Sequence, residues 1–321
     1  MSTALFSHPD CRAHVMARGH PESPQRLDAI DEQLLASGLA QVLERREAPL
    51  VDLDRVALAH DAAHLARLRS ALEPLAASGR SHVLDADTMA GPGTWTAMCR
   101  AAGAAVAATD AVIAGEVRNA FCAVRPPGHH ATRDTAMGFC FFNNVAIAAH
   151  HALTVHGLQR VAIVDFDVHH GNGTEDIIAG DDRVLMVSYF QHPHYPYSGD
   201  MPSADNLLNL PVAAHTEGSE LRSLIEAHWL PRLDAFAPQM LFISAGFDAH
   251  REDPLGQLGL VEADYAWITR RLMDVADRHA QGRIVSCLEG GYHLSALGRS
   301  VAAHLRALAD VDEMELPEAH A

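Results

Sequence analysis

The sequence predicts an α/β protein with one parallel sheet covered by helices on both faces. Five short segments are mainly apolar without alternation, and such continuous runs are typical of strands buried on both faces. They lie at residues 121–124, 161–166, 184–189, 240–246 and 284–291. Helical segments alternate with these runs, which favours a doubly wound or related parallel sheet. No repeat or low-complexity linker divides the 321 residues, so we expect a single domain over 1–321.

The expected helices follow from apolar periodicity and end signals. Residues 20–38 read as a helix with Ser23 as N-cap, Pro24 at the first helical position and Gly38 just beyond the end. Further helices are expected at about 95–115, 143–156, 217–236, 262–281 and 294–309. The acidic residues 310–321 are expected to form a frayed tail.

Composition excludes several classes of function. The formal charge is −17, from 41 acidic and 24 basic residues, and every basic residue is Arg. A phosphate-binding P-loop is excluded because its motif requires Lys. The acidic balance argues against partners such as nucleic acid or anionic membrane lipid. It either steers cationic substrates or simply keeps the surface soluble, and we favour the second interpretation.

The chain has no sign of export or of a membrane span. The N-terminus lacks the basic and apolar regions of a secretory signal. No apolar run approaches the ~20 residues that cross a bilayer. The five cysteines form no CxxC pair and are odd in number, so free thiols in a reducing cytoplasm are expected.

Polar side chains follow each of the apolar runs. The segments "RPPGHH", "DFDVHHGNG", "AGFDAH" and "EGGYH" come directly after predicted strands, and Ser188 lies near the end of another. Ligands of open parallel sheets bind outside the carboxyl ends of the strands. The sequence therefore predicts one polar site at one edge of the sheet.

Three of these residues have the chemistry of a metal site. Asp167 and His169 are two positions apart, so in extended chain both point to the same side. Carboxylate and imidazole are zinc-type ligands, and Asp248 is the natural third. A calcium-binding EF-hand loop is excluded because His170 and Asp176 stand where Gly and Glu are required. Hydrogen-bonded core polar groups remain the alternative.

The oxygen-rich ligand set leaves the choice of metal open. Zinc is the best candidate, and iron(II), cobalt(II) or manganese(II) would also be accepted by two carboxylates and one imidazole. His129 and His130 are metal ligands, acid–base groups or turn residues. Beside a metal-activated water one of them becomes a general base, and one held by Asp165 becomes cationic. The hydroxyl of Tyr292 is a candidate oxyanion donor, unless this is an ordinary half-buried aromatic residue.

The motifs resemble those of the zinc-dependent histone deacetylase family. The resemblance rests on "GHPESPQRL", "RPPGHH…GFCFFNN", "DFDVHHGNGTED", "SAGFDAHREDPLG" and "LEGGYH". It covers residues 6–309 in the family's order and is strongest to the class II-like branch of bacterial deacetylases and acetylpolyamine amidohydrolases. It implies the arginase–deacetylase fold, with a parallel sheet of about eight strands flanked by helices.

The resemblance also implies roles for individual residues. The zinc ligands would be Asp167, His169 and Asp248. His130 would be the general base and then the general acid, and His129, paired with Asp165, its electrostatic partner. Tyr292 would polarise the scissile carbonyl. Asn172 stands where class I members carry an aspartate, so the partner of His130 is neutral in this chain.

Two further sites come from the resemblance alone. A structural potassium ion would bind Asp165, main-chain oxygens of Asp167 and His169, and Ser188. Gly138 and Phe139 would form one wall of the acyl-lysine tunnel. Tyr195 would form the opposite wall, although its loop, "YFQHPHYPYSG", departs from the family pattern.

The substrate implied is an acylated amine, and its identity stays open. The polyamine-selective branch carries an acidic gatekeeper near the "DP" turn, where this chain has Leu255. That favours acyl-lysine in proteins, or a neutral acyl amide, over acetylated polyamines. An arginase-type ureohydrolase with two metal ions and a non-catalytic acyl-lysine binding protein are the competing interpretations. Acyl-chain length and a homo-oligomeric state are not decided, and residues 10–24 are expected to form an active-site rim or a subunit contact.

Overall fold

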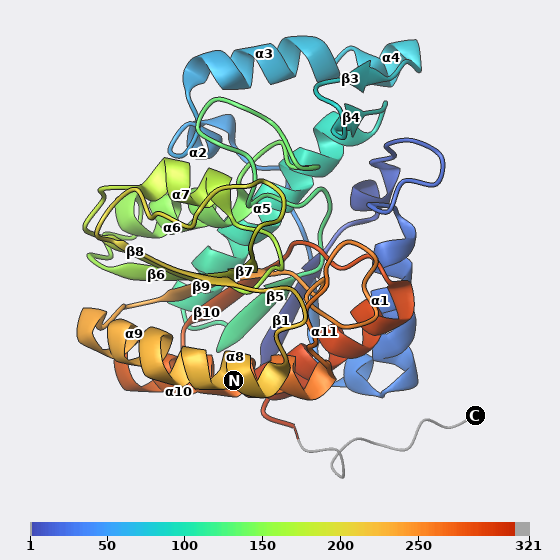
Figure 1. The fold of residues 1–321 in the computed structure, drawn as a ribbon. Coiled ribbons are helices and arrows are strands. Elements are labelled where there is room, and N and C mark those ends of the chain that lie inside the picture. The colour runs from blue at the N-terminus through green and yellow to red at the C-terminus, as the bar shows by residue number, and fades with distance from the viewer. Residues whose placement is uncertain (1, 312–321) are drawn as a thin grey trace.

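An eight-stranded sheet lies at the centre of the structure, a computed structural model that describes residues 2–311. The strand order is β2-β1-β5-β10-β9-β6-β7-β8, and every paired neighbour is parallel (Figure 1). The strands are β1 Thr3–Ser7, β2 Glu44–Glu47, β5 Asn119–Cys122, β6 Val161–Asp165, β7 Val184–Gln191, β8 Leu207–Val212, β9 Leu241–Ala245 and β10 Ile284–Leu288. A separate small hairpin joins β3 His82–Val83 and β4 Met89–Ala90. The predicted fold class is confirmed.

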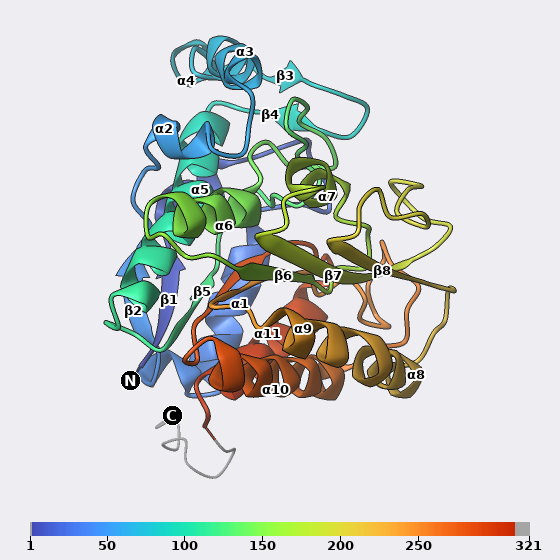
Figure 2. The ribbon, with the colours of Figure 1, turned by 90° about the vertical axis from the view of Figure 1, so that its left-hand side faces the viewer.

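Helices cover both faces of the sheet, as Figure 2 shows with the sheet seen edge-on. One layer contains α5 Thr94–Ile113, α6 Asn144–Thr154 and α7 Asn172–Ile178. The other contains α1 Gln25–Ala36, α8 Gly218–Leu224, α9 Leu230–Phe236, α10 Glu262–His279 and α11 Leu294–Leu308. The short helices α2 Leu53–Val56, α3 Ala62–Leu72 and α4 Leu75–Ser78 lie beyond the first layer (Figure 1). Single turns are η1 Pro9–Ala13, η2 Leu39–Gln41 and the π turn η3 Ile225–Trp229.

The five predicted strands are the central and buried ones. β6, β9 and β10 are buried at every position, and so are β5 and β7. The run at 121–124 was placed too late, since the strand is Asn119–Cys122. The remaining strands of the sheet were not predicted. β2 reads "ERRE" and most of β8 is partly exposed, whereas β1 reads "TALFS" and was missed although four of its five residues are buried. Burial at every position, which the prediction used, holds for the five strands in the middle of the sheet.

Two helix predictions need correction. The segment 20–38 becomes helical only at Gln25, and its N-cap is Pro24, not Ser23, which contributes only its backbone oxygen to Arg26. Gly38 does lie beyond the end, with a φ of 75°. The segment 217–236 contains a π turn at its middle. Pro231, in the first turn of α9, has no N–H to continue the regular ladder.

One expectation about apolar length is wrong. Helix α5 has 20 residues and is long and apolar enough to cross a membrane by length and composition. In this structure 67% of its apolar window is buried, and it packs against α6, β5 and β10. Its apolar character therefore serves the core between the helix layer and the sheet.

The other expectations concern cysteines and the tail. All five cysteines are free and buried, so no disulfide forms among them. Of the tail expected at 310–321, residues 312–321 lie outside the described part of the chain.

Candidate active site

The polar segments that follow four strands in the middle of the sheet lie together at the carboxyl edge of the sheet. Strands β5, β10, β9 and β6 are successive neighbours, and the predicted polar segments follow their carboxyl ends. The structure thus brings "GHH", "GGY", "GFD" and "DFDVHH" together, although the first two segments lie far apart in sequence. This edge is where a parallel sheet places its ligands.

Asp167, His169 and Asp248 form a buried trio of potential metal ligands. Nδ1 of His169 lies 2.9 Å from Oδ1 of Asp167 and 3.2 Å from Oδ2 of Asp248. One ligand atom from each residue lies within 4.8 Å of the others. Both carboxylate side chains are fully buried, and Oδ2 of Asp248 accepts no hydrogen bond from the described residues. Two buried carboxylates with an unsatisfied oxygen fit a divalent cation.

The electrostatics of the trio point the same way. Burial disfavours a charged His169, but Asp167 and Asp248 outweigh this and raise its pKa to about 10. Burial and the nearby Asp167 charge raise the pKa of Asp248. The two carboxylates therefore stabilise a positive charge placed between them. Because His169 carries a proton in the absence of metal, a metal ion must displace that proton to bind.

Gly290 is required for this close approach. A Cβ atom at this position would lie 1.8 Å from Oδ2 of Asp248 and 2.7 Å from Oδ2 of Asp167. The Gly290 N–H instead donates to Oδ2 of Asp167 at 2.9 Å. The "GG" of "LEGGYH" therefore serves the trio as well as the turn before Tyr292.

The two adjacent histidines have different partners and different charges. Nδ1 of His129 lies 3.0 Å from Oδ2 of Asp165, and Nδ1 of His130 lies 2.7 Å from Oδ1 of Asn172. Burial opposes charge on His129, but Asp167 and Asp165 raise its pKa well above the usual value. Burial and the charges of His129 and His169 lower the pKa of His130. His130 is therefore neutral, with its proton on Nδ1 and the Nε2 lone pair available.

Glu289 is a buried residue of the site that sequence reasoning missed. Its Oε2 accepts from the N–H groups of Gly128 and His129 at 2.7 and 3.1 Å, and Oε1 accepts from Ser244. Burial raises the pKa of Glu289 to about 7. The residue fixes the loop that carries both histidines. Its position directly before the glycines, at the end of a buried strand, was the available signal.

Tyr292 is held through its backbone and its ring. Asp253 accepts from the Tyr292 N–H at 2.6 Å and from the His293 N–H at 3.1 Å. The Arg26 guanidinium lies 5.0 Å from the centre of the Tyr292 ring and donates to the Gly291 carbonyl at 2.7 Å. Burial raises the pKa of the Tyr292 hydroxyl, which keeps it protonated. No hydrogen bond of this hydroxyl occurs among the described residues, so it is available as a donor.

A narrow cavity of about 220 Å³ lies over these groups. Its walls are Asp87, His130, Gly138, Phe139, His169, His194, Tyr195, Leu255 and Tyr292. The three residues predicted for the tunnel walls are among them, and so is Leu255 at the gatekeeper position. No local pattern indicated Asp87, whereas His194 immediately precedes the predicted Tyr195. The imidazole of His194 stacks on that of His169, with ring centres 5.0 Å apart, and lies 2.8 Å from the Leu255 carbonyl.

Gly138 leaves room for His130. It has a φ of 56°, and a Cβ there would lie 2.5 Å from Cδ2 of His130. We expect Gly138→Ala to displace the imidazole and lower turnover on the order of 10²-fold, as misplacement by about 1 Å does. Turnover of an acetyl-lysine peptide, the substrate class that the family resemblance implies, measures this. Gly180→Ala is the matched control, because Gly180 also has positive φ but no atom within 4 Å of the added Cβ; equal losses in both variants would refute the argument.

The residues expected to bind potassium are also adjacent. Asp165 and Ser188 are paired across β6 and β7, and both are buried. Ser188 donates its hydroxyl to Asn209 at 3.1 Å, which leaves its oxygen lone pairs free. The main-chain oxygens of Asp167 and His169 accept no hydrogen bond from the described residues. These oxygens are suitable ligands for a hard cation.

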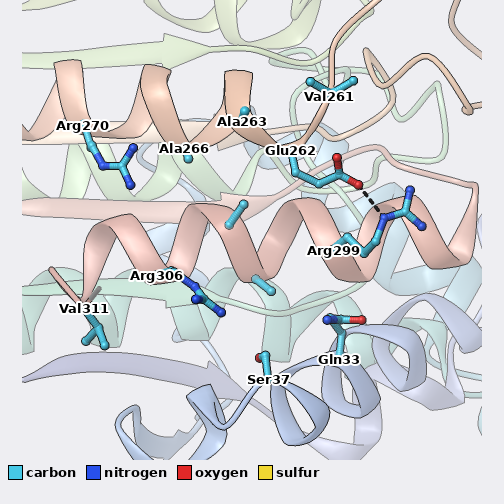
Figure 3. A pocket seen from close by; sticks show the side chains of 12 residues that line it. Gln33, Ser37, Val261, Glu262, Ala263, Ala266, Arg270, Arg299, Arg306 and Val311 are labelled. Atoms are coloured by element: carbon cyan, nitrogen blue, oxygen red, sulfur yellow. Dashed lines mark hydrogen bonds and ion pairs between the residues drawn. The ribbon is translucent and has the colours of Figure 1, made fainter. Parts of the chain in front are cut away.

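Two of the larger cavities lie outside the trio. One, of about 570 Å³, is lined by residues 15–25 and shares Tyr292 with the narrow cavity, so part of the 10–24 segment lies next to that cavity. The other, of about 520 Å³, lies among α1, α10 and α11 and has Arg270, Arg299 and Arg306 in its wall (Figure 3). Arg299 donates a hydrogen bond to the Glu262 carboxylate there (Figure 3). None of the predicted site residues lines this second cavity.

Comparison with known proteins gives a consistent result. A family model described as the histone deacetylase domain matches residues 20–308. A histone deacetylase-like amidohydrolase of Pseudomonas aeruginosa is 39% identical, over 86% of this chain and 73% of that protein. Polyamine deacetylase HDAC10 of Homo sapiens is 35% identical over 96% of this chain, which spans 48% of that protein's length.

A solved structure agrees with these sequence matches. The crystal structure of the HDA15 HD domain superimposes with a TM-score of 0.89 and 32% identity, over 97% of this chain and 90% of that one. The match to the family model covers most of the chain, and the fold agrees with it. The chain therefore belongs to the histone deacetylase family.

Proposed function

We propose that this protein is a metal-dependent amidohydrolase that removes acetyl or another short acyl group from the side-chain amine of acyl-lysine or a similar acylated amine. The observation that supports it is the buried trio of Asp167, His169 and Asp248, with the neutral imidazole of His130 and the Tyr292 hydroxyl beside it in one narrow cavity. We propose zinc as the ion. Iron(II) and cobalt(II) are the alternatives, because the ligand set is rich in oxygen.

Each residue of the site has its own role in the proposed amide hydrolysis. A divalent ion in the trio would polarise the amide carbonyl and lower the pKa of a water molecule toward about 7. Nε2 of His130 accepts the proton of that water as it attacks. The Tyr292 hydroxyl donates a hydrogen bond to the oxyanion that develops on the carbonyl. His130 then returns the proton to the departing amine.

The partners of His130 and His129 fit this division. Asn172 fixes the His130 tautomer without adding a negative charge, so the imidazole stays neutral until it accepts the water proton. His129 keeps its proton because of Asp165 and Asp167 and offers a positive charge to the reacting centre. We further propose that a structural potassium ion binds Asp165, Ser188 and the main-chain oxygens of Asp167 and His169.

Chelation tests the metal requirement. We expect hydrolysis of a fluorogenic acetyl-lysine peptide to stop when the metal is removed by a chelator, and to return when zinc or cobalt is added back. Chelation that leaves hydrolysis unchanged would refute the metal-dependent mechanism. A protein that binds the peptide but never hydrolyses it, with metal bound, would be the non-catalytic binding module instead.

Substrate choice is the second part of the proposal. Leu255 places an apolar side chain at the cavity where an acidic gatekeeper would favour polyamines. Asp87, however, adds a carboxylate to the same walls. Acetylpolyamine hydrolysis is therefore the second candidate function. Equal assays of acyl-lysine peptides, acetylputrescine and acetylspermidine discriminate between them, and a preference for the polyamines would overturn the acyl-lysine proposal.

An arginase-type ureohydrolase is the less favoured alternative. That chemistry needs two metal ions side by side. Among the described residues, the candidate metal group at the narrow cavity has three members, enough for one ion. Hydrolysis of a guanidinium substrate with two adjacent ions at this cavity would support the alternative.

A further inference from the structure

We propose that this protein has a second site for a divalent transition-metal ion, formed by Asp110, His151 and His156 at the surface where α5 meets α6. Asp110 lies in the last turn of α5, His151 lies in the last turn of α6, and His156 lies just beyond α6. One ligand atom from each lies within 4.8 Å of the others. The inference does not rest on the proposed deacetylase activity.

The donor geometry is close to that of a zinc site. Nε2 of His151 lies 2.7 Å and Nε2 of His156 lies 2.6 Å from the same Asp110 oxygen, Oδ1. Ligand bonds of about 2.0–2.1 Å in a tetrahedral site put neighbouring ligand atoms about 3.3 Å apart. Each imidazole nitrogen would therefore have to move away from the carboxylate oxygen by less than about 1 Å to make room for the ion. Two imidazoles and a carboxylate suit zinc, nickel or copper.

The position on the two helices also favours a cation. The last turns of α5 and α6 meet at the cluster, and each helix carries partial negative charge at its carboxyl end. His151 is buried, so one ligand is held rigidly by packing. Asp110 is about half exposed and His156 a quarter exposed, which leaves a path for the ion and for water.

The cluster lies at the far end of α6 from the active site. At the other end, the side-chain amide of Asn143 donates hydrogen bonds to the Ala131 carbonyl and the Thr174 hydroxyl. The side-chain amide of Asn144 donates to the carbonyl of Pro126, which lies on the loop before the catalytic histidines. An 11-residue helix is about 16 Å long. The second ion would therefore join α5 to α6 without touching the reacting groups, and we assign it a stabilising role.

A surface pair elsewhere provides the matched control. His279 lies 2.9 Å from Oδ1 of Asp234, but Arg278 donates to the same oxygen at 2.7 Å. The guanidinium already supplies positive charge, and a third metal ligand is absent from this group in the described structure. A histidine–aspartate contact alone is therefore present there without the proposed site.

The test is a count of zinc ions bound by the purified holoenzyme after equilibrium dialysis against zinc. We expect about two ions per chain for the wild type and for His279→Gln, and about one for His156→Gln and Asp110→Asn. Acetyl-lysine hydrolysis should be the same in all four proteins. Zinc should also raise the unfolding temperature less in the two cluster variants than in the wild type.

Two results overturn the proposal. Wild-type protein that binds a single ion would show that the cluster is only a hydrogen-bonded trio. A second ion that persists in both His156→Gln and Asp110→Asn would place it elsewhere. Because the cluster variants keep the catalytic trio, loss of hydrolysis in all proteins would count against the proposed function and not against this site.

Discussion

Tyr292→Phe should lower the turnover of an acetyl-lysine peptide by about 10²–10³-fold, the usual cost of losing one oxyanion donor. The substitution removes only the hydroxyl. The ring would still contact Arg26 and lie near Phe139, and Asp253 would still hold the backbone. We therefore expect KM and zinc content close to those of the wild type, with the loss confined to kcat.

A second tyrosine offers the control for this substitution. Tyr197 lies in the loop after Tyr195 and is 74% exposed. Tyr197→Phe removes the same atom outside the cavity and should leave kcat unchanged. Wild-type turnover in Tyr292→Phe would remove this hydroxyl from the mechanism.

Asp248→Asn should abolish hydrolysis by removing a metal ligand. Substitutions in the outer shell of metal sites already cost about 10–100-fold in affinity, so the loss of a direct carboxylate ligand should exceed that. Zinc titration monitored by dialysis measures the change. Asp274→Asn, an exposed aspartate paired with Arg271, is the control and should bind zinc normally.

The same variant should not be less stable when metal is absent. Burial and Asp167 raise the pKa of Asp248 in the folded state. A carboxyl group whose pKa is raised on folding destabilises the protein at pH values above its unfolded pKa, because ionisation is then costly. Asparagine removes that cost and can still accept from the Val168 N–H, which lies 2.9 Å from Oδ1. Metal-free Asp248→Asn should therefore unfold at the same or a higher temperature near pH 7, and a lower temperature would contradict the assigned electrostatics.

The sequence predicted the elements of the fold correctly where a sequence pattern has a single physical cause. Continuous apolar runs occur where strands are buried on both faces, so β5, β6, β7, β9 and β10 were recognised. β2 was missed because an edge strand of charged residues has no such pattern. Ser23 was a reasonable N-cap from its residue type, but the helix begins after Pro24.

The residues of the site likewise divide into those that the sequence predicted and those that it missed. Asp167 and His169 were predicted together because they are two positions apart and have the right chemistry for a metal site. The structure places their ligand atoms together, but in the bend that follows β6 and not on extended chain as the prediction assumed. Glu289 and Asp253 were missed because each acts through the backbone N–H groups of residues distant in sequence. Asp87 lines the cavity from the segment before β4, and no local sequence pattern predicts such a tertiary contact.

The most direct test of the central claim is the anomalous scattering of zinc in crystals of the zinc-loaded protein. The account predicts a peak about 2.0–2.3 Å from a carboxylate oxygen of Asp167, a carboxylate oxygen of Asp248 and Nδ1 of His169. A cavity with no peak between these three atoms, or an Asp248 side chain rotated away from the ion, would contradict it.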